Sequence, residues 1–350
     1  MPMTLVRPIA ILVAVACLQV FAAACGSDTE MPANGNVALT PYKIQYPDYF
    51  PQMVLNDQNP LTEEGVALGR KLYYDTRMHK EVGTRACATC HVQSGGFTSD
   101  GIADKFGIGI SVLPHINVGW NSNYLRDGKI QGTIEKIMIF EVEKFFETDV
   151  SVLQADDTYP AEFKQVFGEE TITPKLCGYA LAQFFRTLIS INTKWDQWKQ
   201  GVATLTESEE RGREIFTTDR GGCFNCHPAP LFTDNQFHNN GLNNTFPEEQ
   251  YGRYAVTFDD ADMGKFKTST LRNIAITGPY MHDKRFTTLD EVIEHYSSGI
   301  QASDTLDPVI DGWGGTGLNF TEQEKTDLIA FLNTLTDNDM MTQSSLSNPY

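Results

Sequence analysis

Apolar side chains recur at helical spacing in several stretches of the chain. Near the C-terminus, residues 328–335 place four apolar side chains on one face, and Thr321 with Glu324 forms a capping box at the start of that helix. In another stretch Cys177 lies at helical spacing from Leu181 and the apolar residues that follow. This spacing predicts a buried cysteine that packs as a small apolar residue. Both patterns predict helices.

Two further helical stretches are copies of one another. Residues 61–73 and 205–216 both begin Leu-Thr-Glu, and Gly69-Arg70 matches Gly212-Arg213 near the end of each predicted helix. Each copy is followed shortly by Cys-x-x-Cys-His. The repeat predicts two tandem modules of one ancestral type.

The Cys-x-x-Cys-His motif is the attachment signal of c-type haem. Its two thiols form thioethers with the porphyrin, and its histidine becomes the proximal ligand of the iron. A redox dithiol and half of a zinc site are the alternatives, but the two motifs belong to separate, distant repeat units, which disfavours zinc. The residues are Cys87, Cys90 and His91 in the first motif, and Cys223, Cys226 and His227 in the second.

The net charge of the chain limits the classes of molecule that it is expected to bind. The chain has 350 residues and a formal net charge of −18, which excludes nucleic acid as a default partner and suits a small basic electron-transfer protein. A hydrophobic content of 41% is enough for two domains with a core each.

The N-terminus predicts an exported protein. Residues 1–25 have the charged, apolar and small-residue zones of a signal peptide, and no later stretch is long and apolar enough to span a membrane. The signal resembles that of a lipoprotein, with Cys25 as the lipid-anchored residue, but Ala22 replaces the usual leucine, so cleavage after an Ala-x-Ala site stays an alternative. We expect a tether over 26–45, a loose tail over 341–350, and a periplasmic location.

Longer motifs carry a resemblance to a known family. The blocks are 68–75 before the first haem motif, Tyr124-Leu-Arg-Asp-Gly128, Phe266-Lys-Thr-Ser-Thr-Leu-Arg-Asn273 and Thr277-Gly-Pro-Tyr-Met-His-Asp283. With them, the chain resembles the bacterial dihaem cytochrome c peroxidase and MauG superfamily from about Leu61 to Leu335. The resemblance implies a mostly α fold with two tandem cytochrome c-like haem domains, here 46–204 and 205–340.

The same resemblance implies a division of labour between the haems. His91 would hold the peroxidatic haem and His227 the electron-transfer haem. Peroxidases of this type usually close the second iron with a methionine, whereas MauG-type enzymes use a tyrosine, and Tyr296 is at that position here. Met281 and His295 are the alternative ligands.

Two departures from the family concern electron transfer and activation. Arg126 is found where relatives carry a tryptophan between the haems, and Trp120 is better interpreted as a core aromatic than as its replacement. The loop that in many relatives carries a histidine over the first iron, residues 97–112, contains no histidine, and His115 is interpreted as a non-ligand. We therefore expect the first haem to be open without reductive activation.

The resemblance also implies an acid–base residue and a calcium site. The resemblance implies a glutamate above the first iron; the segment 141–147 offers three, of which Glu143 fits best. It also implies calcium bound by Thr277 and near Pro279, with Asn117 as a substitute for the usual asparagine.

Three functions follow from these residues. The first is a peroxidase that reduces hydrogen peroxide to water with electrons from a cytochrome c or cupredoxin. The second is a MauG-type enzyme that oxidises an amino acid on a protein substrate, which Tyr296 favours. The third is a non-catalytic dihaem electron carrier. A homodimer is left open.

Overall fold

Helices make up most of the regular structure. The computed structural model describes residues 38–98, 105 and 109–350, and Val37–Tyr350 form one compact unit. The expected signal peptide and Cys25 lie outside the described residues. Among the described residues, no helix is long and apolar enough to cross a membrane. The longer helices are α1 (Glu63–Tyr74), α3 (Ile134–Phe140), α5 (Tyr159–Phe167), α6 (Pro174–Phe185), α8 (Glu207–Thr217), α10 (Leu289–Ser298) and α12 (Glu322–Asn333).

Shorter elements connect these helices and carry most of the chemistry. Two antiparallel two-stranded ribbons pair β1 with β2 and β3 with β4. The short helices are α2 (Cys87–Cys90), α4 (Val150–Gln154), α7 (Lys194–Lys199), α9 (Tyr254–Thr257), α11 (Pro308–Asp311) and α13 (Asn338–Thr342), and the strands are β1 (Asn123–Tyr124), β2 (Ile130–Gln131), β3 (Phe237–His238) and β4 (Phe266–Lys267).

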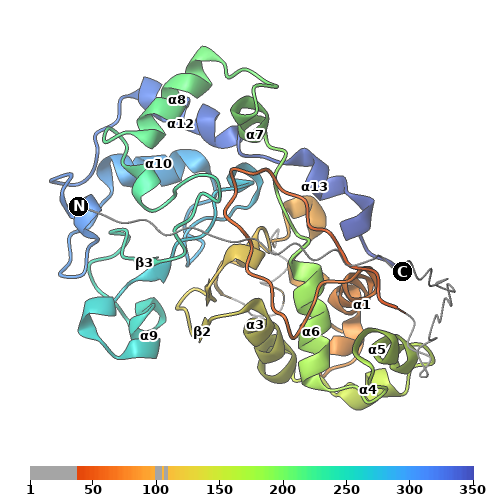
Figure 1. Ribbon diagram of the computed structural model, residues 1–350. Helices are drawn as coiled ribbons and strands as arrows, with labels where there is room; N and C mark the ends of the chain where they lie inside the picture. The colour runs from red at the N-terminus through yellow and green to blue at the C-terminus, as the bar shows by residue number, and fades with distance from the viewer. Residues whose placement is uncertain (1–37, 99–104, 106–108) are drawn as a thin grey trace, which may run out of the picture. The chain divides into compact units, whose positions relative to one another are not determined.

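The internal repeat corresponds to two equivalent helix pairs. Figure 1 shows α1 beside α6 and α8 beside α12, and both pairs are in extensive contact. A side chain at Gly69 would overlap the carbonyl oxygen of Ala180 on α6, and one at Gly212 would overlap that of Asp327 on α12. The matching glycines therefore allow both pairs to cross at close range.

The buried apolar residues form two clusters. The first runs from Leu68 to Leu188 along the chain and also includes Met340 and Leu346. The second runs from Trp195 to Leu335. Cys177 is fully buried in the first cluster, as predicted, and the apolar face of α12 is buried in the second.

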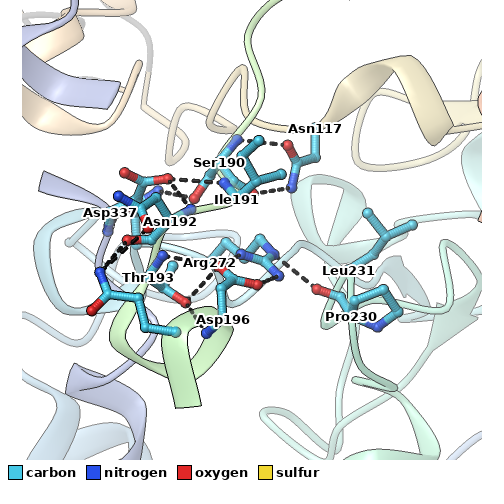
Figure 2. A network of polar contacts seen from close by, with 12 residues as sticks. Asn117, Ser190, Ile191, Asn192, Thr193, Asp196, Pro230, Leu231, Arg272 and Asp337 are labelled. Atoms are coloured by element: carbon cyan, nitrogen blue, oxygen red, sulfur yellow. Dashed lines mark hydrogen bonds and ion pairs between the residues drawn. The ribbon is translucent and has the colours of Figure 1, made fainter. Parts of the chain in front are cut away.

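A buried polar network joins the segment between the clusters to both halves (Figure 2). Arg272 and Asp196 are both fully buried and form a two-pronged ion pair, with N–O distances of 2.7 and 2.8 Å. Arg272 also donates to the carbonyl of Pro230, in the loop that follows the second haem motif. Asn117 exchanges hydrogen bonds with the backbone of Ser190.

The expected loose tail is wrong. Residues Asn338–Thr342 form α13, and Leu346 is only 3% exposed in the first cluster. The Arg70 side chain donates to the carbonyls of Ser344 and Ser347, at 2.8 and 2.6 Å. The tail is therefore held by α1. The polar composition of the tail does not reveal this contact, because α1 is far away in the sequence.

The tether expected over 26–45 is also too long. Thr40 donates to the carboxylate of Glu64, and Tyr42 donates through its backbone to the carbonyl of Leu61. Pro41 forms a bridge with Thr62. From Thr40 onward, the chain is fixed to the start of α1.

Candidate functional site

The first haem motif lines a large apolar cavity. Cys87 begins α2 and is buried, and Cys90 and His91 end this short helix. The cavity has a volume of about 520 Å³. Its apolar walls include Ile116, Val118, Leu125, Ile134, Ile137, Met138, Leu181 and Phe185.

The backbone orients the His91 ring. Its Nδ1 lies 3.0 Å from the carbonyl oxygen of Phe97, which accepts the Nδ1 proton and leaves Nε2 with a free lone pair. Burial lowers the pKa of His91 to about 4, so the ring is neutral at pH 7. A neutral imidazole with Nδ1 anchored is the form that binds iron.

The second motif repeats this arrangement. The Nδ1 of His227 lies 2.9 Å from the carbonyl oxygen of Phe232, and burial lowers the pKa of this histidine. Cys223 begins a 3₁₀ turn (Cys223–Asn225) that is shorter than α2, and Cys226 follows that turn directly. The five cysteines of the described residues are all free thiols, so both motifs keep their thiols.

Tyr296 lies beside the second motif. Its hydroxyl accepts a hydrogen bond from Nδ2 of Asn240 at 3.2 Å, and the same amide donates to the Sδ of Met281 at 3.4 Å. Burial raises the pKa of Tyr296 to about 12, and the thiols of Cys226 and Cys223 add to this effect. The structure thus brings Tyr296 and Met281 together around one amide. The His295 ring, on the same helix, is engaged by the carbonyl of Asn240 at 3.1 Å.

These donor sets fit c-type haem. Each motif offers two free thiols and a neutral imidazole with an available Nε2, and the first has an apolar cavity around them. The described residues contain no cluster of three or more acidic, His or Cys side chains suited to a metal ion.

Known proteins share this sequence and architecture. The profile of the di-haem cytochrome c peroxidase family matches residues 63–204. The methylamine utilization protein MauG of Methylorubrum extorquens is 34% identical over 289 residues, which cover 79% of each chain. A cytochrome c551 peroxidase of Nitrosomonas europaea is 30% identical over 291 residues, which cover 79% of this chain and 81% of that one.

The chain belongs to the dihaem cytochrome c peroxidase and MauG superfamily. It is therefore an oxidoreductase, and its family implies two c-type haems. The structure agrees with this membership. A solved MauG-like protein associated with microbial copper homeostasis superposes with a TM-score of 0.78 at 29% identity, over 88% of this chain and 99% of that one.

Within the superfamily, the acid–base residue needs a correction. Glu143 is solvent-exposed and does not line the cavity, whereas Glu141, two residues earlier, does. Burial raises the pKa of Glu141 to about 7. Glu141 continues the inward stripe of Ile134, Ile137 and Met138 on α3, and this helical spacing is the signal that could have found it.

The sequence position at which the resemblance implies a tryptophan carries a charged residue here, Arg126. The Arg126 side chain lines the cavity and donates to the carbonyl of Ser111. Trp120 instead packs on Tyr46 and Phe50, with ring centroids 5.1 and 5.5 Å apart, and its Nε1 donates to the carbonyl of Pro51. Trp120 is thus a packed aromatic outside the cavity lining, and it does not replace the missing indole.

His115 packs beside His91. The two rings are nearly parallel, with centroids 3.3 Å apart, and the Tyr73 hydroxyl lies 3.3 Å from Nδ1 of His115. Both histidines line the same cavity, and the non-ligand interpretation of His115 stays a prediction. Most of the activation loop, 99–104 and 106–108, lies outside the described residues.

The calcium prediction stays untested. Thr277 follows a 3₁₀ turn (Ile274–Ile276), and the Gly278–Pro279 peptide is cis. The Asn117 amide is occupied on both sides by Ser190, to which it donates at 3.2 Å and from which it accepts at 2.9 Å. Thr277 lies close to Gly96, in the loop that follows the first haem motif.

Proposed function

We propose that this chain is an exported dihaem peroxidase that reduces hydrogen peroxide to water with two electrons from a small redox protein. His91 holds the peroxidatic haem and His227 the electron-transfer haem. A periplasmic location follows from the predicted signal peptide. The observation that carries the proposal is Glu141, a carboxyl group with a pKa raised to about 7 in the wall of the cavity that also contains His91.

The bound haem supplies the iron at which peroxide is reduced. Glu141 contributes the proton transfer, because a carboxyl group with a pKa near 7 can both accept and return a proton at neutral pH. Its carboxylate takes a proton from peroxide and returns it to the departing oxygen, which leaves as water. Two electrons and two protons complete the reduction to two water molecules.

Two rival functions differ in their support. A non-catalytic electron carrier does not require a cavity whose lining includes both the predicted iron ligand and a carboxyl group of raised pKa. A MauG-type oxidation of a partner protein is favoured by Tyr296, whose hydroxyl lies beside the second motif. It therefore stays the second candidate.

Glu141→Gln tests the proposal, with Glu143→Gln as the matched control on the same π-helical turn (Glu141–Phe145). We expect Glu141→Gln to lower the rate of peroxide reduction by roughly 10²–10⁴-fold, since general acid–base catalysis contributes about that much. The wild-type rate should rise as the pH increases through about 7, because the carboxylate is the form that accepts the proton, and Glu141→Gln should lose this rise.

The control variant should behave as the wild type in both measurements. Mass spectrometry should find two covalent haems in every variant, and cyanide should bind the fully ferric protein. Equal loss in Glu143→Gln, or full activity in Glu141→Gln, would contradict the assignment of the proton-transfer residue.

A further inference from the structure

Arg126 brings a positive charge into the haem cavity. It follows β1, is half-buried, and lines the cavity together with Cys87 and His91. Its guanidinium donates to the carbonyl of Ser111, which is a neutral partner. Enclosure in protein lowers the pKa of Arg126 to about 10, so the group is still cationic at pH 7.

A second cation comes from the other half of the chain. Lys267 lies on β4 and also lines the cavity, and its backbone N–H donates to the carbonyl of Arg126 at 2.8 Å. Its ammonium lies 3.4 Å from the carbonyl of Thr268. Burial, together with the charge of Arg126, lowers the pKa of Lys267 to about 8. Two cations therefore share one wall of the cavity.

The two carboxylates that act electrostatically on these cations each pair with another cation. Asp283 faces Arg126 but pairs with Arg285, at 2.5 Å. Asp234 faces Lys267 but pairs with His238, at 2.8 Å. Over the described parts of the chain, neither Arg126 nor Lys267 forms an ion pair. Two enclosed cations without a carboxylate are costly unless an anion joins them.

We propose that Arg126 and Lys267 bind the two propionate carboxylates of the first haem. This assignment rests on the proposed function, in which His91 holds that haem. The charges match, because a haem carries two carboxylates and the cavity wall carries two unpaired cations. The guanidinium of Arg126 suits a carboxylate geometrically, since its parallel N–H groups form two hydrogen bonds to one carboxylate. Because Lys267 belongs to the second half of the chain, it then connects the first haem to that half.

The binding site has a consequence for the reaction. Positive charge beside a haem favours its reduced state, so these two cations raise the reduction potential of the first haem. Arginine cannot be oxidised as tryptophan can. Arg126 therefore tunes the reduction potential of the first haem. In relatives, the residue expected at this position is an aromatic ring that lies between the two haems.

The test is a spectroelectrochemical titration of the holoprotein that resolves the potential of each haem. Arg126→Leu and Lys267→Met each remove one cation, and Arg126→Lys keeps it. Arg253→Leu is the matched control, because its guanidinium donates to the carbonyls of Asp127 and Gly128, next to Arg126 in sequence, without lining the cavity. Mass spectrometry confirms two covalent haems in each variant.

We expect Arg126→Leu and Lys267→Met each to shift the reduction equilibrium of the first haem about tenfold toward the oxidised state, which is about 59 mV for one electron. Arg126→Lys and Arg253→Leu should keep the wild-type potential, and the second haem should shift less in every variant. An unchanged first-haem potential in either of the two deletions, or an equal fall in Arg253→Leu, would overturn the proposal while the peroxidase function stands. A wild-type protein without covalent haem would overturn both.

Discussion

The position of one proton decides what each motif histidine can bind. His91 and His227 donate Nδ1–H to the carbonyls of Phe97 and Phe232, five or six residues further on. The carbonyl holds the ring in one orientation and makes Nε2 a better donor to a metal. Because burial lowers the pKa of both rings, protons do not compete with iron at neutral pH. The two histidines are therefore preorganised in the same way, although one follows a short α-helix and the other a 3₁₀ turn.

Tyr296 is the residue on which the choice between peroxidase and MauG-type function depends. A phenolate ligand favours Fe(III) over Fe(II), because its negative charge stabilises the more positive ion. We expect Tyr296→Phe to change the low-spin spectrum of the second haem and to raise its reduction potential. Iron binding would also deprotonate a phenol whose pKa burial has raised to about 12.

Met281→Leu is the matched control, since Asn240 contacts both side chains. A second-haem spectrum that changes only in Met281→Leu would transfer the ligand role to the methionine and remove the main support for MauG-type chemistry. Electron paramagnetic resonance of the ferric protein distinguishes these two outcomes.

At the scale of elements, the helix crossings show why the repeat contains a glycine. Gly69 and Gly212 lie where α1 meets α6 and where α8 meets α12. We expect Gly69→Ala to lower the free energy of unfolding by about 1–3 kcal/mol, the usual cost of overpacking, because the new Cβ meets a backbone carbonyl that cannot move aside. Gly95→Ala is the control, as nothing lies within 4 Å of its added Cβ. Equal denaturation midpoints for the two variants would contradict this account of the repeat.

The sequence predicts these elements well wherever the signal is local. The capping box at Thr321, the helix that it begins and the predicted helix in 205–216 are confirmed, since caps and apolar spacing act within a few residues. The choice of Glu143 failed at a π-helical turn. The α-helical stripe of α3 reaches inward as far as Glu141, and the wider π-helical turn leaves Glu143 outside.

Long-range contacts were beyond prediction from one sequence. The tail from Ser344 to Tyr350 is short and polar, and what fixes it is the side chains of Arg70 and Tyr74 on α1, more than 250 positions away. The carboxylates near Arg126 and Lys267 are likewise engaged by partners that no motif specifies. Composition predicts what a segment tends to do alone, and these residues act through distant parts of the chain.

At the scale of the whole molecule, stability depends on the polar network between the two apolar clusters. Asp196 follows the first cluster, and Arg272 is inside the second half of the chain. Thr193 and Tyr49 also donate to the Asp196 carboxylate, so its charge is fully compensated. These bonds lower the pKa of Asp196 despite its burial. The contribution of the pair to stability is therefore fully present above the ordinary pKa of a carboxyl group, and it is lost as the pH falls from that value through the lowered pKa of the folded protein.

Breaking this pair should destabilise the protein as a whole. We expect Asp196→Ala to lower the free energy of unfolding by about 3–5 kcal/mol, because it leaves the fully buried guanidinium of Arg272 without a counter-charge. Asp339→Ala is the matched control, since this exposed acid forms a hydrogen bond with Asn192 beside the same network. Adding Arg272→Met to Asp196→Ala should restore part of the loss, since no buried charge is then left unpaired. If the double variant is instead as unstable as the sum of the two single changes, the pair is not coupled, and packing around Trp195 and Phe232 must hold this region together.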